Sequence, residues 1–449
     1  MQLSLRDQHR LRQASSSIIE AEFAGIRDNW ARSRWLLPVN HYAKNCVDKI
    51  EEDLSSRRGI THRHLRDYIA ASSVVHCMDG WSYLGKAIES HLKGNPDIAC
   101  HLGYYAELRA AMAILATEGI GVFNNIHIVV DRRGKCDCLR CGGTHTFAWD
   151  ALEAWTTTSS AVDLIFTVIK PGGLPLRDWA DRFPVPGGFG TILATGWLLQ
   201  WGLDLQRLRE DRAARNDSSY RPTAFSSSRA MPIIEALQFV KHFWEICEPT
   251  ETIRFPILDR HLLRLSLECT FKAAHNRSRR QARRIYARQV QTMLRGLTPR
   301  DLMADEWENF LTFSNSPDQP LILQEARAKD VPQSLRHHIQ VLARATLLLR
   351  IATGATQAKL ESLPGFSRAD LQFWWNGFGE DQCLWHSNEP PEHFTDLWTD
   401  VREAVQNIDS WQTAMGVGGG SYHKLWRENG GAVCVLGSCE RVGLWGLGL

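Results

Sequence analysis

The chain has 449 residues, of which 44% are hydrophobic and 23% are charged, and its formal net charge is +2. These proportions are close to those of globular proteins, so they exclude a mostly disordered chain. The small net charge excludes a globally basic nucleic-acid binder of the histone type, and the length predicts two to four domains.

Residues 1–95 are predicted to form an N-terminal helical region, because Ile19, Phe23, Ile26 and Trp30 recur at roughly helical spacing. The first thirty residues carry charges throughout and lack the apolar centre of a signal peptide. The chain also has no run of eighteen apolar residues that could span a membrane. We therefore expect a cytoplasmic protein that does not enter the membrane.

Residues 96–185 are predicted to form a helical domain with one strand. The clearest helix covers 100–120, where alanines fill the positions beside a large apolar face, and glycines follow it. The segment 126–131 is predicted to be a short strand, because β-branched residues alternate there. Residues 131–145 are rich in Cys and Gly and are predicted to be a loop, before helix returns at 149–169.

Residues 186–415 are predicted to form a C-terminal helical domain that begins with a long helix over 189–214. The tail, 416–449, holds ten glycines and shows neither helical nor strand periodicity, so we expect it to be poorly ordered. The fold class that follows is mainly α: multi-domain helical bundles with one short β element and a Cys/His loop near 126–145.

Three thiols and an imidazole lie close together in the predicted loop: Cys136, Cys138, Cys141 and His145. Zinc prefers four tetrahedral nitrogen or sulfur ligands, and the Cys-x2-Cys spacing of Cys138 and Cys141 places two thiolates within reach of one ion. We name these four residues as candidate ligands of a structural zinc. Cys100, His101 and His127 are alternative candidates from elsewhere in the chain to complete the site in space. The alternative is a surface loop with free thiols, because a second, well-separated ligand pair is missing.

The helix predicted over 189–214 leads into Arg215-Asn216, followed by Tyr220 and Pro222. This element resembles the signature of the HEPN superfamily, which is an Arg, a polar residue and, a few residues later, a His. Members are compact helical bundles, commonly dimeric, and many are metal-independent ribonucleases of prokaryotic defence and toxin systems. The resemblance covers the motif and the helix before it.

The resemblance implies that Arg215 stabilises the charge of a phosphorane while a His acts as general acid or base on a ribose 2′-OH. Tyr220 stands where the family has His, and a phenol with an unperturbed pKa near ~10 is a poor general base at neutral pH. Arg215, Asn216 and Tyr220 are therefore candidate catalytic residues, or mark a version of the motif that only binds. The alternative is ordinary helix termination before Pro222.

Two other Arg…His pairs have a similar separation, Arg254 with His261 and Arg57 with His62. Apolar residues between Arg254 and His261 favour a helix start with a buried His, and Arg57 and His62 lie in a charged turn. Such spacings arise by chance in a chain with 17 His.

Residues 269–300 contain neither Asp nor Glu and are predicted to form a basic amphipathic helix. Arginine favours bidentate contact with phosphate, so this segment predicts a surface for nucleic acid or an acidic protein. The alternative is a solvated face that pairs with acids elsewhere in the fold. The candidate nucleic-acid-binding residues are Arg277, Arg280, Arg283, Arg284 and Arg288.

Two functions follow from these features. The first is a helical subunit that binds RNA, DNA or an acidic partner, within a prokaryotic antiviral defence system if the HEPN resemblance holds. The second is a HEPN-like, metal-independent ribonuclease or toxin-type effector, in which Arg215 binds phosphate and Tyr220 or a neighbour in space moves the proton. We expect the chain to act either as a homodimer or as a subunit of a complex. Motifs for nucleotide hydrolysis or metal-dependent nuclease chemistry are absent from the sequence.

Overall fold

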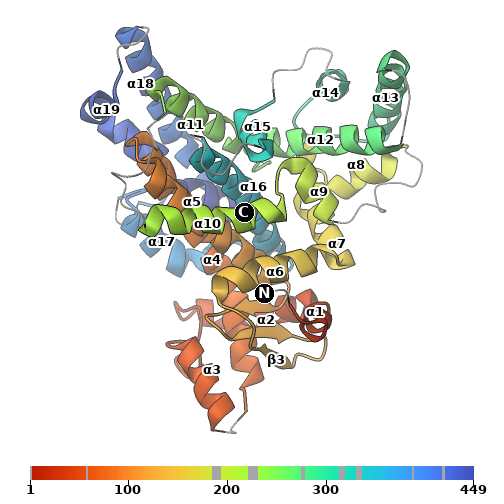
Figure 1. Cartoon of the computed structure of the whole chain (residues 1–449), viewed down its shortest axis with the longest axis vertical. Coiled ribbons are helices and arrows are strands. Elements are labelled where there is room, and N and C mark those ends of the chain that lie inside the picture. Colours follow the sequence, from red (N-terminus) through yellow and green to blue (C-terminus); the bar gives the residue numbers. More distant parts are fainter. Residues whose placement is uncertain are drawn as a thin grey trace.

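The computed structural model describes residues 3–56, 59–184, 194–220, 231–274, 279–312, 319–329, 336–386, 389–416 and 420–448. The side chains of residues 217–220, 274, 279 and 280 lie outside this description. Helices dominate the described residues, with one small sheet near the N-terminal end (Figure 1), which confirms the prediction of a mainly α fold. Within these ranges, the search for a helix long and apolar enough to cross a membrane finds none.

Three helices form the centre of the molecule: α4 (His62–Leu92), α5 (Pro96–Thr117) and α16 (His337–Glu361). Small residues let them approach closely. A Cβ on Gly80 of α4 would lie only 2.5 Å from Leu349 Cδ2 of α16. Because α16 packs between helices that precede it by more than 200 residues of sequence, the predicted N-terminal, middle and C-terminal regions share one continuous hydrophobic core.

A three-stranded antiparallel sheet follows α5, in the order β1 (Ile120–Val122), β2 (His127–Val130), β3 (Cys136–Leu139). β2 is the strand predicted over 126–131. The predicted loop over 131–145 is wrong in part, because it contains β3 and the start of α6 (Thr144–Thr156). β3 was not predicted because it has only four residues, too few to show the alternation of a strand, and lies among cysteines and glycines.

The other helices surround this centre. Those of the first half are α1 (Leu5–Leu11), α2 (Ser16–Trp30), α3 (Cys46–Ser55), α7 (Ser159–Val168), α8 (Leu176–Arg182), α9 (Ala194–Trp201) and α10 (Leu205–Tyr220), with a 3-10 turn at η1 (Pro171–Gly173). Those of the second half are α11 (Ile233–Cys247), α12 (Pro256–Ala274), α13 (Arg279–Leu294), α14 (Ala304–Thr312), α15 (Leu321–Arg327), α17 (Gln372–Asp381) and α18 (Leu397–Met415), with 3-10 turns at η4 (Arg368–Leu371) and η5 (Phe394–Asp396).

The single helix predicted over 189–214 is two helices, α9 and α10, separated at Gly202. Gly202 has a φ of +103°, and a Cβ there would lie 2.8 Å from Ala326 atoms, so this position needs glycine. α10 then continues through Asn216 to Tyr220 instead of ending near 214. The Arg-Asn…Tyr element is therefore part of a helix, and its helix-terminating Pro222 lies outside the described residues.

The expectation of a poorly ordered tail is wrong, because α19 (Tyr422–Leu436) and α20 (Glu440–Leu447) form within it. Every residue of α20 is buried, and the helix packs against α4 and α16. Its glycines explain the missing periodicity. A Cβ on Gly443 would lie 2.5 Å from Met78 Sδ, so glycine is selected here for close packing rather than for disorder.

Candidate functional site

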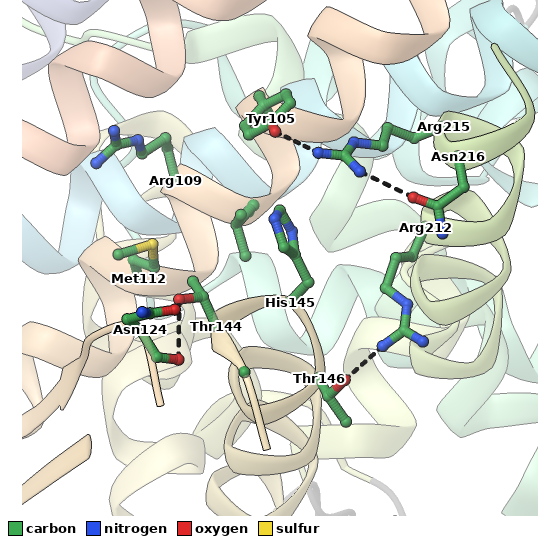
Figure 2. Close-up of a pocket in the computed structure, with 12 residues that line it drawn as sticks. Tyr105, Arg109, Met112, Asn124, Thr144, His145, Thr146, Arg212, Arg215 and Asn216 are labelled. Atoms are coloured by element: carbon green, nitrogen blue, oxygen red, sulfur yellow. Dashed lines mark hydrogen bonds between the residues drawn. The ribbon is translucent and has the colours of Figure 1, made fainter. Parts of the chain in front are cut away.

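A cavity of about 530 Å³ lies between α5, α10 and the start of α6 (Figure 2). Its volume falls in the range of small-molecule and cofactor sites. The polar side chains that line it come from segments distant in sequence: Tyr105 and Arg109 of α5, Asn124 after β1, Thr144, His145 and Thr146 of α6, and Arg212, Arg215 and Asn216 of α10.

The first turn of α6 borders this cavity. Gly143 is the N-cap residue, and no side chain caps the helix. The N–H groups of Thr146 and Phe147 donate back to the Gly143 carbonyl, at 2.9 and 3.0 Å. A helix N-terminus carries partial positive charge and N–H groups that find no acceptor within the helix, so this end of α6 favours an anion.

Arg215 is held in the cavity by three contacts. Its Nη2 donates to the Tyr105 hydroxyl, and its Nη1 donates to Asn216 Oδ1 at 2.8 Å. The guanidinium also lies over the Tyr105 ring, with its Cζ 5.1 Å from the ring centroid. These contacts fix the direction of the guanidinium, which Figure 2 shows pointing across the cavity toward α5.

Two more arginines face the same space. Arg212 Nη1 donates to Thr146 Oγ1 at 2.5 Å, which ties α10 to the first turn of α6. Arg109 Nη1 donates to His76 Nδ1 at 2.7 Å and lies 3.4 Å from Asp79 Oδ2. Among the described residues that line the cavity there is no Asp or Glu. Three arginines and a helix N-terminus therefore line one space, and one of these arginines, Arg109, also pairs with Asp79.

His145 brings an imidazole to this arginine cluster. Its Nδ1 lies 3.1 Å from the Tyr104 hydroxyl, and its ring stacks on Tyr104 with centroids 5.7 Å apart. Burial and the nearby charges of Arg215 and Arg212 lower the pKa of His145 below its usual value. The ring is therefore neutral at neutral pH, which is the form that can accept a proton.

The structure thus brings together residues that sequence analysis had assigned to different sites. Arg215 and Asn216 came from the HEPN-like element, whereas His145 was a candidate zinc ligand. Because His145 precedes Arg215 by 70 positions, no local motif links them, and only the packing of α6 against α5 and α10 places both in one cavity. Arg109, Thr146 and Tyr105 were missed for the same reason, whereas Arg212 lies one turn before Arg215 on α10 and was missed although helical spacing places it on a nearby face. Tyr220 lies on α10, but its side chain is outside the described part of the molecule.

Two of the candidate zinc ligands have different surroundings, since Cys136 lies in the sheet and His145 lines the cavity. Cys136 is buried in β3, where its backbone N–H donates to His62 Nδ1 at 3.1 Å. Burial raises the pKa of the Cys136 thiol to about 12 and that of Cys141 to about 11. Within the described ranges, no three His, Cys, Asp or Glu side chains gather as metal ligands do. Zinc binding by Cys136, Cys138, Cys141 and His145 stays a prediction, and elemental analysis of the purified protein would test it.

The three residues considered as additional zinc ligands have other contacts. His127 stacks on Phe147 with ring centroids 3.7 Å apart, and its Nε2 lies 3.1 Å from the Gly142 carbonyl oxygen. Burial raises the pKa of Cys100 above its usual value. His101 lies beside Tyr105, a residue that lines the arginine cavity, with ring centroids 5.1 Å apart.

The basic helix predicted over 269–300 is shorter: residues 269–274 are the end of α12, and α13 covers Arg279–Leu294. Its apolar residues Tyr286, Val290 and Met293 are buried, whereas Arg283, Arg284 and Arg288 are exposed. Within the described ranges these three arginines make no ion pair, so acids elsewhere in the fold do not neutralise them there. Arg277 lies outside the described residues, and so does the side chain of Arg280.

The described residues of the other two Arg…His pairs make contacts within the fold. Arg254 donates to the Gly448 carbonyl, and His261 is buried beside the Phe310 ring at 5.0 Å. Burial and two neighbouring arginines lower the pKa of His261 to about 3. Arg57 is outside the described residues, and His62 holds the backbone of Cys136.

Searches with the whole chain found no matching family model, no matching curated protein and no matching solved structure. The geometry of the arginine cavity therefore carries the functional argument.

Proposed function

We propose that this protein binds RNA and holds a phosphate group of the strand in the arginine cavity. The observation that carries the proposal is the concentration of Arg109, Arg212 and Arg215 around a space that no described Asp or Glu lines. Guanidinium groups and a helix N-terminus are the groups that proteins use to bind phosphate. Tyr105 and His145 add ring surfaces beside the cationic groups, which suits an unpaired nucleotide.

The direct test is binding of a fluorescein-labelled single-stranded RNA of mixed sequence, measured by fluorescence anisotropy. Arg215→Ala is expected to weaken binding by about tenfold or more, since a hydrogen bond to a charged group contributes about 1.5–3 kcal/mol. Arg209→Ala is the matched control, because Arg209 lies on the same helix but pairs with Asp150 and Glu153 outside the cavity. Equal affinity of the two variants would remove the cavity from the proposal.

A second candidate function is metal-independent cleavage of that RNA, and the neutral His145 beside Arg215 favours it. In such a reaction His145 takes the proton of a ribose 2′-OH, the 2′ oxygen attacks phosphorus, and the bond to the 5′ oxygen breaks. The products are a 2′,3′-cyclic phosphate and a 5′-hydroxyl that receives a proton. Arg215 and Arg212 stabilise the charge that develops on the phosphoryl oxygens.

Cleavage is tested by incubating the labelled RNA with the protein in excess EDTA. We expect His145→Gln to abolish product formation while it leaves binding within about threefold of wild type, because a general base contributes mainly to the rate. Intact RNA after incubation with the wild-type protein would reject cleavage and leave the binding proposal in place.

The exposed arginines of α13 support a second contact with the same strand. Arg283, Arg284 and Arg288 offer charge without a defined pocket, which is typical of contacts that follow a phosphate backbone. An acidic protein is the other partner that fits this face. Competition between RNA and a poly-glutamate peptide for the protein distinguishes the two partners. A surface that is specific for one of them binds that one with high affinity and the other only weakly.

A further inference from the structure

We infer that Asp211 and Arg344 are positioning residues of the arginine cavity: their buried ion pair fixes α10 so that Arg212 and Arg215 face α6 and α5. This inference rests on the proposed phosphate-binding role of the cavity. It concerns two residues that do not line the cavity and that no sequence motif marks.

Asp211 and Arg344 form a bidentate ion pair, whose two hydrogen bonds restrict the relative orientation of the side chains. Arg344 Nε donates to one oxygen of Asp211 at 2.9 Å, and Arg344 Nη2 donates to the other at 2.7 Å. Both side chains are almost completely buried, at about 1% exposure. Two parallel hydrogen bonds in a dry interior fix both the distance and the rotation between α10 and α16, because each bond weakens steeply when its angle changes.

Asp211 is also the main anchor of its part of α10. Leu205 and Leu208 attach the start of the helix to the core. After Leu208, Asp211 is the one fully buried side chain among those that the structure describes on α10. Arg212 follows it directly, and Arg215 lies one turn further along the helix. The direction of both arginines therefore depends on how Asp211 is held.

The charges around the pair are consistent with this role. Glu107 of α5 lies beside it, with its Oε1 3.7 Å from Arg344 Nε, and His337 Nε2 lies 3.2 Å from Asp211 Oδ1. Burial and the charge of Asp211 raise the pKa of Glu107 well above its usual value. Burial opposes the charge on Asp211, yet Arg344 and His337 lower its pKa. Arg344 is therefore committed to Asp211 rather than shared equally between two carboxylates.

A buried ion pair is often replaceable by apolar residues without loss of stability, so stability alone does not explain it. An apolar contact has no preferred direction. A variant with Asp211→Leu and Arg344→Met can therefore keep α10 packed while it loses the rotational constraint. This separates positioning from folding.

The same helix, α16, offers a matched control. Arg350 makes a second buried bidentate pair, with Asp259 of α12, at 2.8 and 2.6 Å. Neither Arg350 nor Asp259 lines the cavity. The variant Asp259→Leu with Arg350→Met changes the core by the same chemistry at a place away from α10.

The experiment measures the affinity of both double variants for the labelled RNA, well below their unfolding temperatures. We expect the Asp211/Arg344 variant to bind at least about tenfold more weakly than wild type, because small displacements of aligned groups have effects of this size. The Asp259/Arg350 variant is expected to bind within about twofold, and circular dichroism reports whether both are folded. Should the first variant fail to fold, Asp211→Asn keeps the shape of the side chain and is expected to show a smaller reduction in affinity.

Wild-type affinity in the Asp211/Arg344 variant, or in Asp211→Asn where that replaces it, would overturn the inference, and so would an equal reduction in both double variants. If the wild-type protein does not bind RNA, the proposed function fails instead. If Arg215→Ala weakens binding while the Asp211/Arg344 variant does not, only the positioning role fails.

Discussion

The arginines of the cavity and those of α13 have the same chemistry but opposite surroundings. Arg212 and Arg215 are held by Thr146, Tyr105 and Asn216 before any ligand arrives. Arg283, Arg284 and Arg288 extend into solvent from one face of a helix. Held arginines lose little freedom on binding and can select a geometry, whereas exposed ones supply attraction that salt screens. The cavity is therefore suited to specificity and α13 to general attraction.

The largest expected effect is that of removing both α10 arginines from the cavity. Arg212→Ala together with Arg215→Ala should weaken RNA binding by about 100-fold or more, since each loses hydrogen bonds of about 1.5–3 kcal/mol to a charged phosphate. Anisotropy titrations at constant salt measure this. A reduction below tenfold would mean that the two surfaces do not differ as their contacts imply.

The next effect concerns α13 and should depend strongly on salt. Arg284→Ala with Arg288→Ala is expected to weaken binding about three- to tenfold near 0.1 M salt and to lower the slope of log Kd against log salt by about 0.7 for each phosphate that the protein no longer neutralises. Titrations at four salt concentrations give the slope. An unchanged slope would show that these arginines do not contact the strand.

A smaller substitution tests whether the orientation of Arg215 is fixed before a ligand binds. Tyr105→Phe removes the hydroxyl that accepts from Arg215 but keeps the ring beneath its guanidinium. Affinity should fall by about two- to tenfold, because a neutral hydrogen bond contributes about 0.5–1.5 kcal/mol. Tyr422→Phe is a suitable control, since it also removes a bonded hydroxyl, which donates to the Met231 carbonyl, and Tyr422 does not line the cavity.

The cavity and α13 should also differ in their response to pH. His145 has a lowered pKa in the free protein, and a bound phosphate raises it again by neutralising Arg212 and Arg215. Binding then takes up a proton, so affinity should rise a few-fold as the pH falls below about 6.5, and His145→Gln should remove this rise. The free protein should change in the opposite direction: its lowered His145 pKa means that the unfolded state binds the proton better, so its stability falls over the same window.

The smallest expected effect is on stability. Arg284→Ala with Arg288→Ala should change the free energy of unfolding by no more than about 0.5 kcal/mol, because substitutions of exposed side chains usually have effects of this size. Urea denaturation measures it. A larger decrease would show that these arginines support the fold rather than a ligand.

Local patterns in the sequence predicted the helices and strands whose formation depends on residues close together in the chain. The alanine-rich helix α5 and the strand β2 are where periodicity placed them, and the buried Tyr286, Val290 and Met293 confirm the apolar face of α13. The candidate site was only half predicted. Arg215 and Asn216 were found because they are adjacent in a recognisable element, whereas His145 and Arg109 meet them only through contacts between distant helices.

In the tail, the prediction from local sequence was wrong. Its glycines resemble those of a flexible segment, yet Gly443 and Gly446 are required because α20 fits closely against Met78 and Thr353. One sequence does not distinguish a glycine that gives freedom from a glycine that permits close packing. The partner atoms that decide between them belong to other parts of the chain.

The burial of α20 has a consequence for how the chain folds during synthesis. The part of the α20-covered surface that belongs to α4 is synthesised long before α20, because α4 precedes it by about 350 residues of sequence. Contacts between residues so far apart in sequence form slowly, and the apolar surface promotes aggregation until α20 covers it. A ribosome-bound chain that ends before Glu440 should therefore bind chaperones and be cleaved readily by proteases, and both properties should disappear when the final helix docks.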